Sequence, residues 1–207
     1  MAWLRKKRLE IISIHIPKTG GTSFWRLLEH IYGPQAVQRV FPKNYQTFTP
    51  TTVKSSIRAL HGHFRYSKLT QQVELSTQVK LISWVRNPVD RVISNYYYRI
   101  EKNEMKKVGL LNYASRTTAR NRMGHHLTGM DLSNFFFIGI LEKFWEDCSQ
   151  LGHMMNWPGF PHFWENMSGY EDKQVSRQVR DEIRALNKED EEIYRCALDL
   201  RLKRISQ

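Results

Sequence analysis

The stretch LEIISIHIPKTGGTSFWRLLEHIY, residues 9–32, decides the fold. Its first eight residues are almost continuously apolar and rich in β-branched side chains, which is typical of a strand buried on both faces of a parallel sheet. The segment PKTGG (17–21) interrupts this strand, and residues 22–32 then repeat apolar side chains at helical spacing. We therefore predict a strand, a tight turn and a helix, with Thr22 or Ser23 as the N-cap residue.

The same unit recurs further along the chain. Residues 79–85 predict a second buried strand, followed by a helix with Asn87 as its N-cap and Pro88 at its first position. Residues 135–140 predict a third strand, which leads into a helix over residues 141–155.

The rest of the chain is less regular. A weaker strand near Ile57–Leu60 runs into a His-Gly-His segment, and the charged tail from Lys173 predicts two packing helices. Residues 33–56 and 157–169 are the long irregular stretches. Alternating strands and helices predict an α/β fold, a parallel sheet with helices on both faces. The length predicts a single domain over residues 1–207.

The charge balance indicates the kind of partner. Lys and Arg number 32 against 20 acidic residues, a formal net charge of +12. Such an excess favours an anionic partner such as a nucleotide, an acidic glycan or a membrane surface, although a basic surface that only aids solubility is the plain alternative. There is neither a basic run interleaved with aromatic residues nor a zinc-finger spacing, so we expect no nucleic-acid partner.

Cysteine usage and hydropathy predict the compartment. Cys148 and Cys196 are too few for a disulfide framework, and we expect buried thiols in a reducing compartment. The apolar run after the basic N-terminus is too short for a signal peptide, and no stretch reaches the roughly 20 apolar residues of a membrane span. We therefore predict a cytoplasmic protein, with a lumenal enzyme that has lost its anchor as the alternative.

In parallel α/β sheets, ligands bind at the carboxyl ends of the strands. The first polar cluster at such an end comprises Lys18, Thr19, Gly20, Gly21, Thr22 and Ser23. The glycines permit close backbone approach, the amides that open the helix favour an anion, and Lys18 adds a positive charge. The cluster predicts a phosphate cradle. It is not a Walker A loop, because Lys18 precedes the glycines instead of following them. A glycine-rich turn without a ligand is the plain alternative.

A second cluster follows the strand over residues 79–85. Arg86 ends that strand, and Ser94 lies two turns into the next helix. A guanidinium and a hydroxyl placed beside a helix N-terminus suit a dianionic phosphate. Arg86 could equally be a surface ion-pair partner, and Arg91 could equally form a structural salt bridge.

At this point the chain resembles a known family. HIPKTGGTSFWRLL (15–28) and WVRNPVDRVISNYYY (84–98) resemble the two signatures by which sulfotransferases bind 3′-phosphoadenosine-5′-phosphosulfate (PAPS). They are most similar to the carbohydrate branch that contains the heparan sulfate 2-O- and 6-O-sulfotransferases and their bacterial relatives. The resemblance covers residues 10 to about 150. It implies a three-layer fold like that of P-loop NTPases and transfer of a sulfuryl group from PAPS to a hydroxyl acceptor.

The resemblance also implies roles for the two clusters. Lys18 would contact the sulfonate and the bridging oxygen, the segment from Thr19 to Ser23 the 5′-phosphate, and Arg86 with Ser94 the 3′-phosphate. Physical chemistry agrees for the lysine, because charge builds on the leaving phosphate oxygen and a nearby ammonium stabilises it. No pair of carboxylates suggests a magnesium site, so we expect a reaction without a metal.

The third cluster is His61-Gly62-His63. Residues two apart in an extended segment point to the same side, so both rings could face the cleft. The acceptor hydroxyl needs a base, for which histidine has a suitable pKa. The family's carbohydrate enzymes carry a similar segment, whose second histidine resembles the base. We predict His63 as the base and His61 as its neighbour or a substrate contact. A structural pair or an incidental metal site is the alternative.

Part of the chain departs from the family. Many members close a basic glycine-rich loop over the 3′-phosphate, whereas residues 166–174 contain one glycine and one lysine, so Ser168 or Lys173 would have to substitute. Three arginines between residues 116 and 122 could contact an anionic acceptor or line a solvated helix face.

Two other functions compete with sulfuryl transfer: an ATP-dependent kinase on a similar fold, and a binding module for anions or glycans without catalysis. The basic charge and the carbohydrate-type motifs favour a saccharide or another polyhydroxyl compound as the acceptor. The sequence does not indicate an oligomeric state.

Overall fold

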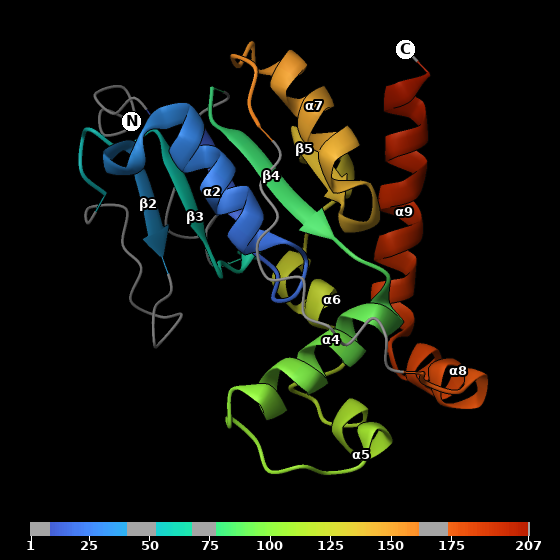
Figure 1. The fold of residues 1–207 in the computed structure, drawn as a ribbon. Coiled ribbons are helices and arrows are strands. Elements are labelled where there is room, and N and C mark those ends of the chain that lie inside the picture. The colour runs from blue at the N-terminus through green and yellow to red at the C-terminus, as the bar shows by residue number, and fades with distance from the viewer. Residues whose placement is uncertain (1–8, 41–52, 68–77, 162–173, 207) are drawn as a thin grey trace.

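The computed structural model describes residues 9–40, 53–67, 78–161 and 174–206 (Figure 1). This part of the chain forms a five-stranded sheet in the order β2-β3-β1-β4-β5, with every pair parallel. The strands are β1 (Ile11–Ile14), β2 (Val37–Val40), β3 (Ala59–Gly62), β4 (Lys80–Val85) and β5 (Phe137–Ile140). The predicted α/β class is confirmed.

Two hydrophobic cores flank the sheet, because alternate residues of each strand project to opposite faces. On one face, Ile12 and Ile14 of the central strand pack against helix α6 (Arg122–Leu127) and helix α9 (Lys188–Ile205). On the other face, Ile11 packs with apolar side chains of two further helices. These are α2 (Gly21–Tyr32) and α7 (Phe144–Met154). The result is the three-layer arrangement that the resemblance implies (Figure 1).

A third cluster of apolar side chains joins three helices near the carboxyl ends of the strands (Figure 1). They are α4 (Pro88–Glu101), α5 (Leu110–Ala114) and α8 (Arg177–Leu186). Short 3₁₀ turns complete the described elements: η1 (Pro34–Ala36), η3 (Leu132–Asn134) and η4 (Leu141–Lys143). No helix in the described ranges combines the length and the apolar character needed to cross a bilayer.

Most of the predicted elements agree with the structure to within a few residues. Strand β2 was missed, because its four residues include Gln38 and Arg39 and show no continuous apolar run. Strand β3 extends further than expected and includes His61 and Gly62. The tail forms two helices as predicted, whereas part of the irregular stretch over 157–169 lies outside the described residues.

Helix starts follow two different rules here. Asn87 caps α4 as predicted, since its side chain accepts hydrogen bonds from the amides of Val89 and Asp90 at 3.1 and 3.3 Å. The predicted cap of α2 is wrong: the N-cap residue is Gly20, in the left-handed conformation and with no side-chain cap. The tight turn before α2 needs a positive φ at this position, which glycine adopts without strain.

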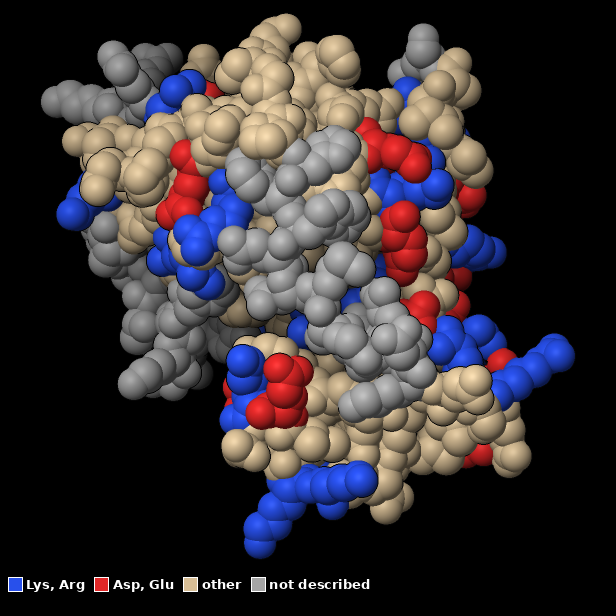
Figure 2. Space-filling view, viewed as in Figure 1, with Lys and Arg blue, Asp and Glu red and all other residues tan. Residues whose placement is uncertain are grey.

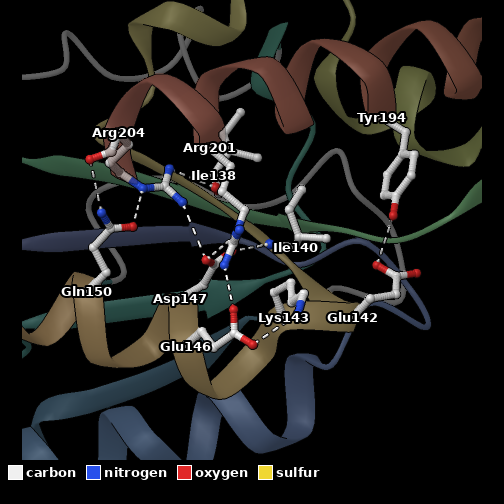
Figure 3. Close-up of polar contacts among 10 residues, drawn as sticks. All are labelled: Ile138, Ile140, Glu142, Lys143, Glu146, Asp147, Gln150, Tyr194, Arg201 and Arg204. Atoms are coloured by element: carbon white, nitrogen blue, oxygen red, sulfur yellow. Dashed lines mark hydrogen bonds and ion pairs between the residues drawn. The ribbon is translucent and has the colours of Figure 1, made fainter. Parts of the chain in front are cut away.

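Hydrogen bonds and ion pairs, centred on the buried Asp147, hold helix α9 to β5 and α7 (Figure 3). Asp147, 1% exposed, accepts a hydrogen bond from the amide of Ile140 at 2.8 Å and one from Arg201 at 2.7 Å. One turn further along α9, Arg204 donates to the Ile138 carbonyl and to Gln150 at 3.1 and 2.6 Å. The C-terminal helix is thereby held against the edge strand of the sheet.

Candidate active site

The loop between β1 and α2 turns through two residues with left-handed backbone angles. Lys18 has φ of 71° and Gly20 has φ of 81°. The hydroxyl of Thr19 is fully buried and donates to the Ile16 carbonyl at 2.8 Å. This hydrogen bond within the loop stabilises its turn. The turn leads directly into α2, whose first amides have no partner within the helix and favour an anion.

The two glycines of this loop are required by close packing. A Cβ atom on Gly21 would collide with the imidazole ring of His15, and one on Gly20 would lie 2.6 Å from Cδ1 of Leu141. A larger residue at either position would push the loop away from the sheet. The backbone of the predicted phosphate cradle is therefore restricted by His15, which follows β1, and by Leu141 of η4.

Lys18 lies in a partly desolvated position. Burial, and next the positive charge of Arg86, lowers its pKa to about 8. Its Nζ atom lies 4.1 Å from the ring centroid of Tyr98 on α4. The π face of Tyr98 attracts the ammonium and holds it beside the loop.

The first and second clusters meet at this loop. Arg86 is buried, and its Nη1 approaches the carbonyl oxygen of Lys18 at 3.4 Å. Ser94 precedes Tyr98 by four residues, so it occupies the face of α4 that is turned toward Lys18.

The Ser94 hydroxyl supports the phosphate assignment. It is fully buried, and it has no hydrogen-bond partner among the described residues. A buried hydroxyl without a partner costs about 1–3 kcal/mol, so the site favours an added acceptor. A phosphate oxygen is such an acceptor, and the residues present fit the 3′-phosphate that the resemblance implies.

Arg91 has the structural role that was left open. Its side chain is fully buried, donates to the Ala119 carbonyl at 2.6 Å, and forms an ion pair with Asp190 on α9 at 3.5 Å. Asp190 in turn accepts from the amide of Gly124 at 2.9 Å. Arg91 therefore ties α4 to α6 and α9.

The two predicted histidines meet a third one. His61 lies opposite Ser13 in the β1–β3 register, and its Nδ1 is 3.0 Å from the serine Oγ. The ring of His15, at the end of β1, lies 5.0 Å from the ring of His61 and 4.6 Å from that of His63, between centroids. The rings of His61 and His63 therefore both lie close to that of His15.

The hydrogen bond of His63 defines its tautomer. Its Nδ1 lies 3.0 Å from the carbonyl oxygen of His15, which can only accept, so Nδ1 carries the proton and Nε2 the lone pair. Burial lowers the pKa of His63 to about 4, and the charges of Arg122 and Arg39 act in the same direction. Burial likewise lowers the pKa of His61 to about 3. Both rings are neutral at neutral pH.

The sequence interpretation missed His15 and His126. His15 belongs to the predicted strand 9–16 and alternates with Ser13, so the reasoning applied to His61 and His63 would have found it. His126 is buried on α6, bonds through Nδ1 to the Phe64 carbonyl at 2.7 Å, and lies 6.2 Å from His63 between ring centroids. The fold brings it near the other histidines.

The remaining candidates divide as follows. Tyr96 packs within the cluster formed by α4, α5 and α8, and its hydroxyl donates to the Val108 carbonyl at 2.6 Å. Arg122 is close enough to the histidines to lower the pKa of His63, whereas Arg116 stacks near Tyr113. Ser168 and Lys173 lie outside the described residues, and those that are described contain no group of three ligand side chains able to hold a metal ion.

Comparison with known proteins gives two kinds of match. The profile described as "Sulfotransferase family" matches residues 2–201. The fold is similar to that of a sulfotransferase from Alicyclobacillus acidocaldarius, with a TM-score of 0.55, 15% identity, and coverage of 89% of this chain and 93% of that one. It is also similar to mouse sulfotransferase SULT7A1 complexed with PAP, with a TM-score of 0.58, 14% identity, and coverage of 93% and 89%. Among curated proteins, no sequence matches this chain.

Proposed function

Because this chain belongs to the sulfotransferase family, whose enzymes take a sulfuryl group from PAPS and release PAP, we propose that it sulfates a hydroxyl group of a carbohydrate with Lys18 and His63 as catalytic residues. One observation carries the assignment of the base. The neutral ring of His63, with its proton on Nδ1, lies at the same end of the sheet as the Lys18 loop. The match over residues 2–201 supports treating the whole chain as one sulfotransferase domain.

The donor side of the site uses positive charge. Arg86 and the buried hydroxyl of Ser94 bind the 3′-phosphate, and the amides at the start of α2 bind the 5′-phosphate. Lys18 places its ammonium beside the bond that breaks, where negative charge develops on the leaving oxygen. A partly desolvated ammonium stabilises that charge more strongly than a fully hydrated one.

The acceptor side uses the histidines. The acceptor oxygen attacks sulfur in line with the leaving phosphate oxygen, so one oxygen–sulfur bond forms as the other breaks. Nε2 of His63 takes the hydroxyl proton, while the His15 carbonyl holds Nδ1–H and keeps the ring in the right tautomer. His61, 1% exposed and bonded to Ser13, acts as a neighbour that supports this arrangement.

A carbohydrate acceptor is supported by the likeness of the two sequence motifs to those of carbohydrate sulfotransferases and by the net charge of +12. The test is transfer of radiolabelled sulfur from PAPS to a panel of oligosaccharides, phenols and aliphatic alcohols, with mass analysis of the product. We expect labelled oligosaccharide, in EDTA as well as in buffer. Label appearing only on a phenol or a simple alcohol would overturn the carbohydrate assignment.

The competing functions give different results in the same assay. A kinase would transfer phosphate from ATP, would require Mg²⁺ and would lose activity in EDTA. A binding module would retain oligosaccharide without transferring sulfur. A cytoplasmic location stays a prediction, supported by the unpaired thiols of Cys148 and Cys196 and tested by cell fractionation.

A further inference from the structure

The candidate groups follow the order of the strands along the carboxyl end of the sheet. Arg86 follows β4, Lys18 follows β1, and His61 and His63 lie at the end of β3. In an in-line transfer the acceptor hydroxyl approaches from the side opposite the leaving group. With the donor groups at β4 and β1 and the base at β3, the acceptor has to lie toward β2.

Strand β2 presents a cation on this side. Arg39 is exposed and lies opposite His61 in the parallel β2–β3 register, so the two side chains project to the same face of the sheet. Its charge is among the groups that lower the pKa of His61 and His63. Arg39 is therefore a neighbour of His61, and its charge acts on the proposed base, His63, which follows in the chain.

An indole ring orients this guanidinium. The Cζ atom of Arg39 lies 3.9 Å from the ring centroid of Trp25 on α2, and that of Arg26 lies 4.3 Å from it. Stacking engages the flat face of a guanidinium, whereas its N–H donors lie in the plane and stay directed away from the ring. An arginine held in this way loses little conformational entropy when it binds a planar anion.

The surrounding charge leaves a net positive site. Glu29 pairs with Arg26 at 3.2 Å and its charge also acts on Arg39, so these three side chains carry one negative and two positive charges. Figure 2 shows Lys and Arg side chains gathered over the region of α2 and β2, with acidic side chains beside them. The net positive charge of this group attracts an anion to Arg39, although acidic side chains lie nearby.

We propose that Arg39, oriented by Trp25, binds an anionic group of the acceptor, a carboxylate or a sulfate ester, beside the hydroxyl that is sulfated. The acceptor is then an acidic saccharide. This inference rests on the proposed function, since it presupposes that His63 is the base and that the donor lies over β1 and β4. It assigns Arg39 to recognition of the acceptor and gives it no part in donor binding.

The experiment compares three forms of one tetrasaccharide: with hexuronate carboxylates, with these reduced to alcohols, and reduced but carrying sulfate esters. In the wild-type protein we expect kcat/KM to be about 10- to 100-fold higher for at least one acidic form than for the neutral form, as for one charged hydrogen-bonded pair. Which acidic form is preferred distinguishes a carboxylate from a sulfate ester.

The decisive variant is Arg39→Gln. It should remove most of the preference for the acidic acceptor and leave the PAP affinity within about twofold of wild type, measured by calorimetry. Arg39→Lys, which keeps the charge but loses the planar fork, should retain part of the preference. Thermal unfolding of each variant checks that the fold persists.

Arg58→Gln is the matched control. Arg58 also stacks on an aromatic ring, at 4.6 Å from the Tyr32 centroid, and pairs with Glu10, but it precedes β3 at the amino end of the sheet. This variant loses the same charge and should keep the preference for the acidic acceptor. If Arg58→Gln and Arg39→Gln lower it equally, a diffuse charge effect replaces the proposed site.

The outcomes separate this inference from the proposed function. Sulfation of all three tetrasaccharides at equal rates, or an unchanged preference in Arg39→Gln, would overturn the role of Arg39 while sulfuryl transfer stands. If no tetrasaccharide accepts sulfur, calorimetry with PAP present decides: binding of an acidic form that Arg39→Gln abolishes supports the subsite, and equal binding or none refutes it.

Discussion

Lys18 and His63 carry opposite requirements at the same end of the sheet. In the proposed mechanism, Lys18 must be charged to stabilise the leaving oxygen, and His63 must be neutral to accept a proton. Burial pushes the pKa of each group downward, to about 8 for the lysine and about 4 for the histidine. Between these values the ammonium and the neutral imidazole coexist: burial keeps His63 neutral, while Lys18 stays protonated below its lowered pKa.

The first prediction concerns the pH dependence of Lys18. Because the ammonium is lost as pH rises through its pKa, kcat/KM should fall above about pH 8. Lys18→Arg should remove this alkaline limb, since a guanidinium stays charged, and Lys18→Ala should lower kcat far more than PAP affinity. Steady-state rates between pH 6 and about 10 test it; a mutant with normal kcat and only a raised KM would make Lys18 a simple anchor.

The second prediction concerns His63. Its low pKa means that no acidic limb should appear near 6.5, the ordinary histidine value, so kcat/KM should be flat from about pH 5 to 7. His63→Ala should reduce the rate by about 10²–10⁴ with little change in PAP affinity.

His61→Ala serves as the comparison and should be milder. If it proves the more damaging variant, or if His63→Ala keeps near-normal turnover, another group is the base.

At the scale of elements, hydrogen bonds connect the C-terminal helix to the segment beside the proposed donor site. Asp147 of α7 joins the Ile140 amide to Arg201 of α9, and Glu142 of η4 accepts from Tyr194 of α9 at 3.3 Å (Figure 3). Glu142 also accepts from the backbone amide of Asn87, the residue that follows Arg86, at 2.8 Å. Helix α9 is thus connected to the start of α4 through described side chains.

The third prediction compares two neighbouring acids on α7. Asp147→Ala leaves the buried Ile140 amide and Arg201 without their shared acceptor, and should lower the free energy of unfolding by about 3–5 kcal/mol. Glu146→Ala removes a solvent-exposed partner of the same arginine and should leave stability nearly unchanged. Urea denaturation of both variants measures the difference. Equal losses would mean that burial of Asp147 is not the cause.

At the scale of the whole molecule, folding brings positive charge from distant segments together at the carboxyl end of the sheet. Lys18 and Arg86 are 68 residues apart in the chain, yet the Arg86 side chain reaches the Lys18 carbonyl. Ser94 adds a buried hydroxyl that has no partner among the described residues. A ligand with two phosphates would contact all three groups and stabilise the folded state as a unit.

The fourth prediction follows from this linkage. PAP at about 100 times its dissociation constant should add about 2.7 kcal/mol of stability, raising the unfolding midpoint by about 5–10 °C for a chain of this size. AMP lacks the 3′-phosphate and should bind about tenfold more weakly or worse. Arg86→Ala should make PAP and AMP equivalent in differential scanning fluorimetry. Equal shifts by PAP and AMP in the wild type would contradict the assignment.

The sequence alone predicted the features that depend on local chemistry. Periodicity identified four of the five strands and the principal helices, and the glycine turn with Lys18 indicated an anion site. Both kinds of feature depend on the local sequence, because a few neighbouring residues determine the backbone geometry and the burial pattern. Asn87 at the N-cap of α4 is another such feature. Strand β2 was not predicted, because a short strand with polar residues has no distinct local pattern.

Strand order and register were decided only by the tertiary structure. They place Ser13 beside His61, 48 residues away, bring the ring of His15 close to those of His61 and His63, and set Arg39 opposite His61. The lowered pKa values of Lys18 and His63 also arise from burial by segments distant in the chain. Pairing between strands and desolvation depend on non-local contacts, which no short stretch of sequence specifies.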